Sequence, residues 1–177
     1  MKIYALAFFV LFTVSCGNPH DSQSISGTSS AWQDDYPQTP DSDYTPGELC
    51  PEADYLRYPE QIRYCKRNVS RDTKQEVIAM YDDDLGYSVG SMPRSLFKVD
   101  HYIPLCAGGA NTEKNLWPQH KSVYKITDPL EPKVCELMSL GGITQAEVVD
   151  LVNLAKHDLE RAPQVIRDLD SKLNSIR

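Results

Sequence analysis

The sequence predicts an α+β domain in which one short β-hairpin and the helix after it are surrounded by further helices and stabilised by disulfide bonds. Three observations predict it. Two strand-like apolar runs flank a glycine-rich loop, helical periodicity recurs on both sides of them, and four cysteines follow the N-terminal region. With 177 residues, 41% of them hydrophobic, the chain is long enough for one domain plus extensions.

The first 16 residues have the composition of an export signal. An apolar run over residues 3–14 is shorter than the roughly 20 residues that a membrane-spanning helix needs. Residues 13–17 then resemble a bacterial lipobox, with Cys16 as the lipidated residue and the new N-terminus. Thr13 stands where such motifs usually have Leu, so cleavage and release is the alternative. We therefore expect an exported protein, either a lipoprotein of the outer membrane or cell surface or a secreted or periplasmic one.

Residues 17–48 are predicted to be a disordered acidic tether. They are rich in Ser, Pro, Asp and Thr and hold too few aliphatic side chains to offset the entropy of ordering them. Up to Leu49 this segment has six acidic residues and no Lys or Arg. Without it and Lys2, 17 basic and 19 acidic residues remain, so the net charge of −7 falls to −2. A nearly neutral domain over residues 49–177 predicts no tight, salt-sensitive static binding to phosphate, but an enzyme needs only a local positive patch.

Four cysteines after the signal predict two disulfides in an oxidising compartment. Three pairings exist, and we favour Cys50–Cys65 with Cys106–Cys135 because each closes a fairly short loop. Four buried free thiols are the alternative. No C-x-x-C pair is present, so a cysteine zinc cluster is not expected.

Helices are expected on both sides of the central strands. Ser70 is a predicted N-cap for a helix to Asp83 with an apolar stripe at Val77, Ile78 and Tyr81. The stretch Asp82–Asp84 lacks the ligand spacing of a calcium loop and is expected to be a solvated helix end. Thr144 to Glu147 forms a capping box. A last helix is predicted over residues 164–176, and core packing is the expected role of all these stripes.

The central strands are predicted at residues 97–105 and 115–117. A turn-rich loop over residues 107–111 separates them, and Pro118 is expected to end the second strand. A helix is expected to begin between Lys121 and Thr127. Pro129 and Pro132 limit where, because proline fits best in a first turn.

These strands carry the most informative residues of the chain. The stretch reads Asp100-His101-Tyr102-Ile103-Pro104-Leu105, then Gly108-Gly109, then Asn115-Leu116-Trp117-Pro118. This pattern resembles the HNH endonuclease family, whose members share a ββα-metal core. A segment like residues 65–70 also occurs upstream in small secreted bacterial HNH proteins, so the resemblance covers about half of the chain.

The resemblance and the chemistry of phosphodiester hydrolysis suggest roles. His101 is the expected general base, since an imidazole titrates near neutral pH. Asp100 is the expected first metal ligand, although neighbouring strand side chains face opposite sides unless the strand ends there. Asn115 is expected to hold the loop and orient the histidine. The third position is open between His120, which we favour, and Asp128, for which N-capping of a following helix is the alternative.

One divalent ion is expected as cofactor. Mg²⁺ is favoured, and an Asp–His pair would also accept Mn²⁺ or Zn²⁺. Four basic residues are candidates for phosphate binding, with Arg67 favoured because it lies in the recurring upstream segment: Arg67, Lys98, Lys121 and Lys125. Trp117 is expected in the core rather than as a platform for base stacking.

We therefore predict an exported, metal-dependent endonuclease that cleaves DNA, and RNA as an alternative substrate, with little sequence specificity. No helix-turn-helix or zinc-finger pattern points to sequence readout. Two alternatives stay open: an inactive HNH-fold binding or scaffold lipoprotein, and a disulfide-stabilised metal-binding module without catalysis. No protein partner is indicated, and a membrane contact depends on lipidation at Cys16.

Overall fold

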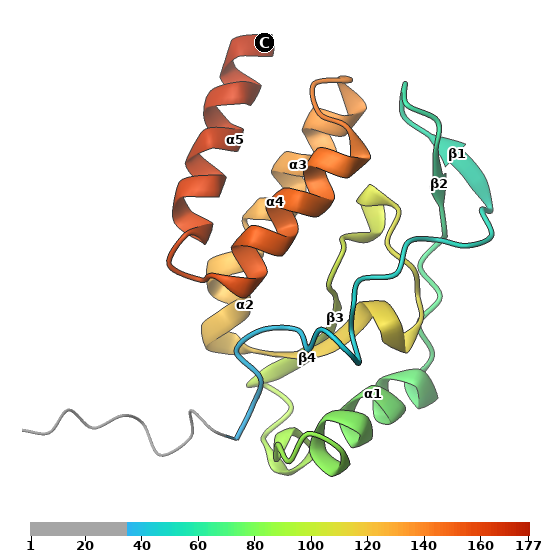
Figure 1. Cartoon of the computed structure of the whole chain (residues 1–177), viewed down its shortest axis with the longest axis vertical. Helices are drawn as coiled ribbons and strands as arrows, with labels where there is room; N and C mark the ends of the chain where they lie inside the picture. Colours follow the sequence, from blue (N-terminus) through green and yellow to red (C-terminus); the bar gives the residue numbers. More distant parts are fainter. Residues whose placement is uncertain (1–34) are drawn as a thin grey trace, which may run out of the picture.

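The computed structural model describes residues 35–177 as an α+β domain (Figure 1). The predicted signal peptide, the lipidation site Cys16 and residues 17–34 of the predicted tether lie outside the described residues. Two antiparallel hairpins, β1–β2 and β3–β4, are combined with five α-helices within the described range. No helix of that range is long and apolar enough to cross a membrane.

The central hairpin pairs β3 (Phe97–His101) with β4 (Leu116–His120), and α2 (Lys121–Thr127) follows at once. His101 is opposite Leu116 and Phe97 is opposite His120. The predicted first strand was too long, because Pro104 turns the chain into a short 3₁₀ turn at Leu105–Ala107. Pro118 does not end β4 but lies within it, which a two-stranded sheet tolerates because alternate N–H groups face away from the partner strand.

The predicted caps are confirmed. Ser70 accepts a hydrogen bond from Thr73 N at the start of α1 (Arg71–Asp83), which buries the predicted stripe. Thr144 and Glu147 form a reciprocal capping box at the start of α4 (Gln145–His157). The last helix, α5 (Ala162–Ile176), begins two residues before the predicted start. Asp82 accepts hydrogen bonds from the backbone N–H groups of residues 89 and 90, which gives it a structural role.

Two strands were not predicted, and one helix was considered only through the alternative role of Asp128 as its N-cap. The hairpin of β1 (Tyr55–Arg57) and β2 (Ile62–Tyr64) has strands of three residues each, too short for a visible alternation. Helix α3 (Leu130–Ser139) begins directly after Pro129 and carries Pro132 in its first turn, where a proline needs no N–H partner. Helices α3, α4 and α5 lie together on one side of the central hairpin, and α1 covers the other (Figure 1).

Both predicted disulfides are confirmed. Cys50 is bonded to Cys65, and Cys106 is bonded to Cys135, with 5.7 Å between the Cα atoms of each pair. The first bond ties the end of β2 to the segment before β1. The second ties the loop after β3 to α3. Two disulfides fit an extracellular or periplasmic protein.

The prediction of a disordered tether is wrong for residues 35–48, which pack on the domain. Tyr36 is 7% exposed and Thr45 is 1% exposed. Thr45 Oγ1 is 2.9 Å from the hydroxyl of Tyr81 and donates to the carbonyl of Leu116 at 3.2 Å. Composition failed here because a few aromatic and hydroxyl side chains suffice to attach an otherwise polar segment to an existing core. Residues 35–48 therefore belong to the folded domain, which was predicted to begin at residue 49.

Candidate active site

A buried asparagine holds the loop that follows β3. Asn115 is fully buried, and its Oδ1 accepts a hydrogen bond from Ile103 N at 2.8 Å. Its Nδ2 donates to the carbonyls of Ile103 and Ala110, each at 3.0 Å. Its own carbonyl accepts from Tyr102 N at 2.7 Å. Asn115 thus closes the loop as predicted, and it acts on His101 through the backbone rather than by direct contact.

Gly109 is required by the same closure. A Cβ atom at this position would lie 2.0 Å from the carbonyl oxygen of Ile103 and 2.6 Å from Nδ2 of Asn115. Both neighbours are fixed by the hydrogen bonds just described, so neither can move away cheaply. The Gly-Gly pair therefore allows the backbone of the loop to approach the end of β3.

Asp100 and Asp128 share one ammonium group. Lys98 Nζ lies 3.0 Å from Oδ2 of Asp100 and donates to both carboxylate oxygens of Asp128 at 2.8 and 2.9 Å. Lys98 and Asp100 are two residues apart on β3 and so face the same side. Asp128 reaches them from the end of α2, where its carboxylate caps no helix: α3 begins after it with Pro129 at its N-cap position.

Two further charged groups were missed by the sequence analysis. Lys156 is 6% exposed, and its Nζ donates to the carbonyl of His101 at 2.7 Å. Glu131 is partly buried and close enough to Asp100 for the two carboxylates to interact. The helical pattern held a signal for Lys156, because this lysine continues the buried row Val148–Val152 at a spacing of four residues. No pattern in the sequence pointed to Glu131.

Acidic and basic side chains around Asp100 shift the pKa values of one another. Burial alone would raise the pKa of Asp100, but the ammonium groups of Lys156 and Lys98 outweigh it and hold that pKa below its usual value. Burial raises the pKa of Glu131, and the nearby carboxylate of Asp100 raises it further. Burial lowers the pKa of Lys156 despite the attraction of Asp100 and Glu131. The side of β3 that carries Asp100 is thus a compact cluster of opposite charges.

Asn111 fixes the protonation of the His101 ring. Nδ2 of Asn111 donates to the carbonyl of Lys66 at 2.8 Å, so its Oδ1 is the atom that lies 3.1 Å from Nε2 of His101. An amide oxygen only accepts, so Nε2 carries the proton and donates. The Nδ1 atom then holds the free lone pair, and burial lowers the pKa of the imidazole. This neutral tautomer is the form that a general base requires.

His120 does not join this group, which corrects the favoured prediction. It is opposite Phe97 on β4, three residues or about 10 Å along the strand from Trp117, the partner of Asp100, and its side chain is on the other face of the hairpin from Asp100. Its Nδ1 accepts from Ser122 N at 3.2 Å and so caps α2. Its ring stacks on Tyr36 at 3.9 Å. The alternative, Asp128, is the residue that lies with Asp100.

The four residues predicted to bind phosphate also lie in different places. Arg67 is exposed and, after burial, its charge is among the causes that lower the pKa of His101, so it lies near that ring. Lys98 belongs to the carboxylate cluster. Lys121 begins α2 next to His120, away from His101, and Lys125 is exposed on the same helix. Trp117 is completely buried, which agrees with its expected core role.

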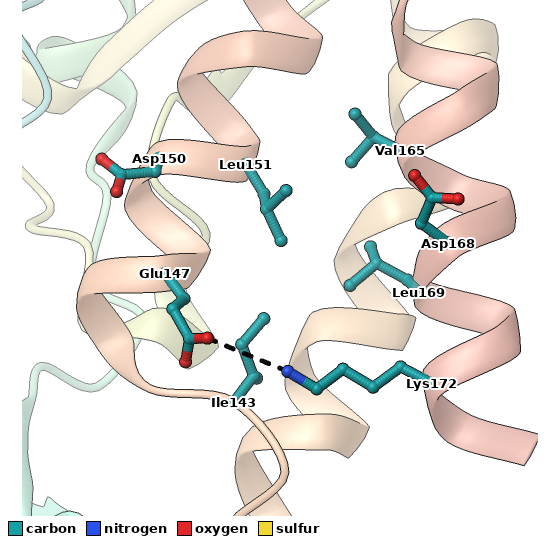
Figure 2. Close-up of a pocket in the computed structure, with 8 residues that line it drawn as sticks. All are labelled: Ile143, Glu147, Asp150, Leu151, Val165, Asp168, Leu169 and Lys172. Carbon is teal, nitrogen blue, oxygen red and sulfur yellow. Dashed lines mark ion pairs between the residues drawn. The ribbon is translucent and has the colours of Figure 1, made fainter. Parts of the chain in front are cut away.

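A separate hollow between α4 and α5 shows what the rest of the helical side offers (Figure 2). Its floor is formed by Ile143, Leu151, Val165 and Leu169, and a weak ion pair between Glu147 and Lys172 spans its rim at 3.9 Å. It contains neither histidine nor a paired set of buried acids. This hollow therefore offers no group comparable to the histidine and partly buried carboxylate of the β3–β4 hairpin.

The donor set near Asp100 suits a hard divalent cation. As the side chains stand, no three His, Cys, Asp or Glu residues between positions 35 and 177 converge on one point. Asp100 and Asp128, however, already converge on a single cation, the ammonium of Lys98. Mg²⁺ commonly takes one or two carboxylates and completes its shell with water and phosphate oxygens.

Known proteins offer no guide to this site. Comparisons of the chain with protein-family models, with curated proteins and with solved structures found no match. Its chemistry follows from its own geometry: a pair of carboxylates that converge on a cation, a neutral histidine with a fixed tautomer, and a free guanidinium.

Proposed function

We propose that this chain is an HNH-like endonuclease that hydrolyses phosphodiester bonds in DNA or RNA with little sequence specificity. One observation carries the proposal. Asp100 and Asp128 meet one cation, the carboxylate of Asp100 is close enough to His101 for the two groups to interact electrostatically, and Asn111 leaves the Nδ1 lone pair of the ring free. The order strand, loop, strand, helix is that expected from the sequence motif.

Asp100 and Asp128 would hold a divalent ion, Mg²⁺ or Mn²⁺, once Lys98 moves aside. Such an ion, when bound, supplies positive charge for the phosphate and for the oxygen that leaves. His101 Nδ1 accepts the proton of the attacking water. Arg67 and the released Lys98 bind phosphate oxygens. The buried ammonium group of Lys156 helps to keep Asp100 ionised.

The disulfides and the predicted export signal support a site of action outside the cytoplasm. Cys16 would anchor the protein to a membrane if it is lipidated, and the acidic segment after it would then link the anchor to the domain. Nutrient scavenging, predation and defence against foreign DNA would all fit this placement.

Plasmid cleavage tests the proposal. The purified chain with its disulfides intact should degrade plasmid when Mg²⁺ or Mn²⁺ is added and should stop in EDTA. His101→Ala should lower the rate by about 10²–10⁴, the usual contribution of a general base. His157→Ala, which alters an exposed histidine of α4, is the matched control and should keep the rate.

An inactive binding or scaffold protein is the second candidate. It is favoured by Lys98, which occupies the point where Asp100 and Asp128 converge. No cleavage with Mg²⁺, Mn²⁺, Zn²⁺ or Ca²⁺, together with no metal binding by calorimetry, would support the scaffold. Metal binding without cleavage would instead identify a metal-binding module.

A further inference from the structure

The β1–β2 hairpin concentrates positive charge in an otherwise acidic chain. Between residues 55 and 67 there are four cations and one acid, and two further acids, Glu52 and Asp54, lie on the segment that the disulfide ties to the hairpin. The cations are Arg57, Arg63, Lys66 and Arg67. Three of them are exposed and Arg57 is partly buried. This local excess is the electrostatic pattern that a polyanion would recognise.

Aromatic rings alternate with these cations. Tyr55 and Tyr64 are directly opposite each other, with 4.9 Å between ring centroids. Arg57 lies over the ring of Tyr64 at 4.3 Å, and Lys66 lies over that of Tyr55 at 5.8 Å. Tyr55 is 43% exposed and the neighbouring Leu56 is 53% exposed. A small domain has no folding reason to leave both of these large side chains in water.

The hairpin is held rigidly although it is short. The Cys50–Cys65 disulfide closes its base, and the side chain of Ile62 is buried. In its turn, Tyr58 and Gln61 have φ angles of +64° and +59°, a region that non-glycine residues rarely adopt. Such strain persists where surrounding contacts fix the backbone, and it is common at binding sites. A rigid platform loses little entropy when a flexible strand binds to it.

The hairpin also leads directly into the candidate active site. The carbonyl of Lys66 accepts the hydrogen bond from Asn111, and Asn111 in turn contacts His101. Arg67 follows at once and lowers the pKa of His101. Lys66 and Arg67 would therefore lead a chain of phosphates from the hairpin to the general base.

We propose that the β1–β2 hairpin is the docking platform for an unpaired nucleic-acid strand, with Tyr55 stacking on a base while Lys66 beside it and Arg63 on the opposite face of the hairpin bind the backbone. The inference rests on the proposed nuclease function. Base faces are covered in a duplex and open in a single strand, so exposed tyrosines select unpaired bases. The competing explanation is that these rings and cations only hold the small hairpin together.

Fluorescence anisotropy in EDTA separates the two explanations, because it measures binding without cleavage. The probes are a labelled oligonucleotide of about 20 nucleotides and the duplex of the same sequence, with the whole disulfide-bonded chain. Wild type should bind the single strand at least about fivefold more tightly than the duplex. Tyr55→Leu should weaken single-strand binding about five- to tenfold, whereas Tyr55→Phe, which keeps the ring, should stay within about twofold.

Charge is tested by a second pair of variants. The double change Arg63→Gln and Lys66→Gln should reduce the slope of log Kd against log salt by about 1.4, since each phosphate contact to a single strand contributes about 0.7. The matched control, Arg167→Gln with Lys172→Gln on α5, removes the same charge from a distant helix and should leave the slope unchanged.

Three results would overturn the platform: equal affinity for duplex and single strand, Tyr55→Leu binding like wild type, or the control pair weakening binding as much as the hairpin pair. Circular dichroism of each variant verifies that it is folded, and the exposed Arg63 and Lys66 changes test the idea even if Tyr55→Leu unfolds. Specific binding without cleavage in any metal would refute the nuclease and keep the platform. Cleavage at the wild-type rate by both hairpin variants would refute only the platform.

Discussion

Replacing Asn115 by leucine tests the loop on which the candidate active site depends. The leucine has a similar size but cannot bond to the N–H of Ile103 or to the carbonyls of Ile103 and Ala110. Three buried backbone groups would lose their partner, at about 1–3 kcal/mol for each group left unsatisfied. Partial repair by water and small backbone shifts brings the expected loss to about 3–6 kcal/mol, a large part of the 5–15 kcal/mol that stabilises a typical domain.

Urea denaturation of the oxidised chain, followed by circular dichroism, measures this loss. In a thermal scan the same change corresponds to a drop of roughly 10–20 °C in Tm. Asn153→Leu is the matched control: Asn153 is exposed on α4, so its replacement should change the stability by less than about 0.5 kcal/mol. An Asn115→Leu variant that loses less than about 1 kcal/mol would refute the account of the loop.

Three other predictions follow from the same contacts. Lys98→Met should tighten Mn²⁺ binding by about tenfold in calorimetry, because it frees the carboxylates that Lys98 neutralises; weaker binding would contradict the proposed metal ligands. Removing the second disulfide with Cys106→Ser and Cys135→Ser should cost about 3–4 kcal/mol in urea denaturation, since it opens a loop of 29 residues; an unchanged midpoint would contradict this. Thr144→Ala should cost about 1 kcal/mol at pH 7. Hydrogen bonds from the backbone N–H and the hydroxyl of Thr144 lower the pKa of Glu147 below 4.5, so their stabilisation is present above that pH and is lost as the pH falls through the lowered pKa. Thr144→Ala removes only the hydroxyl, which donates to the carboxylate and accepts from Glu147 N. The difference between Thr144→Ala and wild type should therefore shrink in part in acid, and a difference that stays constant would exclude the bond between hydroxyl and carboxylate.

The helices and disulfides were predictable because their signals are local. Ser70 and the Thr144–Glu147 pair mark helix starts through hydrogen bonds within one turn, and the structure shows both. The favoured cysteine pairing followed from loop length alone. The segment over residues 35–48 was mispredicted because its order comes from distant partners such as Tyr81, which no local pattern reveals.

The candidate site was predictable only in part for the same reason. The motif placed Asp100, His101 and Asn115 at one end of a hairpin. The choice between His120 and Asp128 depended on where β4 ends and α2 begins, and spacing alone could not decide it. Because β4 continues to His120, this residue lies about 10 Å along the strand from the partner of Asp100 and on the other face of the hairpin, and the end of α2 returns Asp128 to Lys98 and Asp100.

The composition of the loops also holds information that lies outside the motif. Tyr and Arg residues are dense between positions 55 and 67, but only Arg67 was considered for substrate binding. Asn111 was read as a turn residue, and its contact with His101 depends on the backbone of Lys66, 45 residues earlier in the chain.

The most direct test of the central claim compares two substitutions in one cleavage assay. The account predicts that Asp128→Asn lowers Mg²⁺-dependent cleavage of a single-stranded oligonucleotide by about 10–100-fold, as loss of a metal ligand or of its support usually does. His120→Ala should leave the rate within about threefold of wild type, because that ring lies by Tyr36 and caps α2. The reverse result, with His120→Ala inactive and Asp128→Asn unaffected, would contradict it.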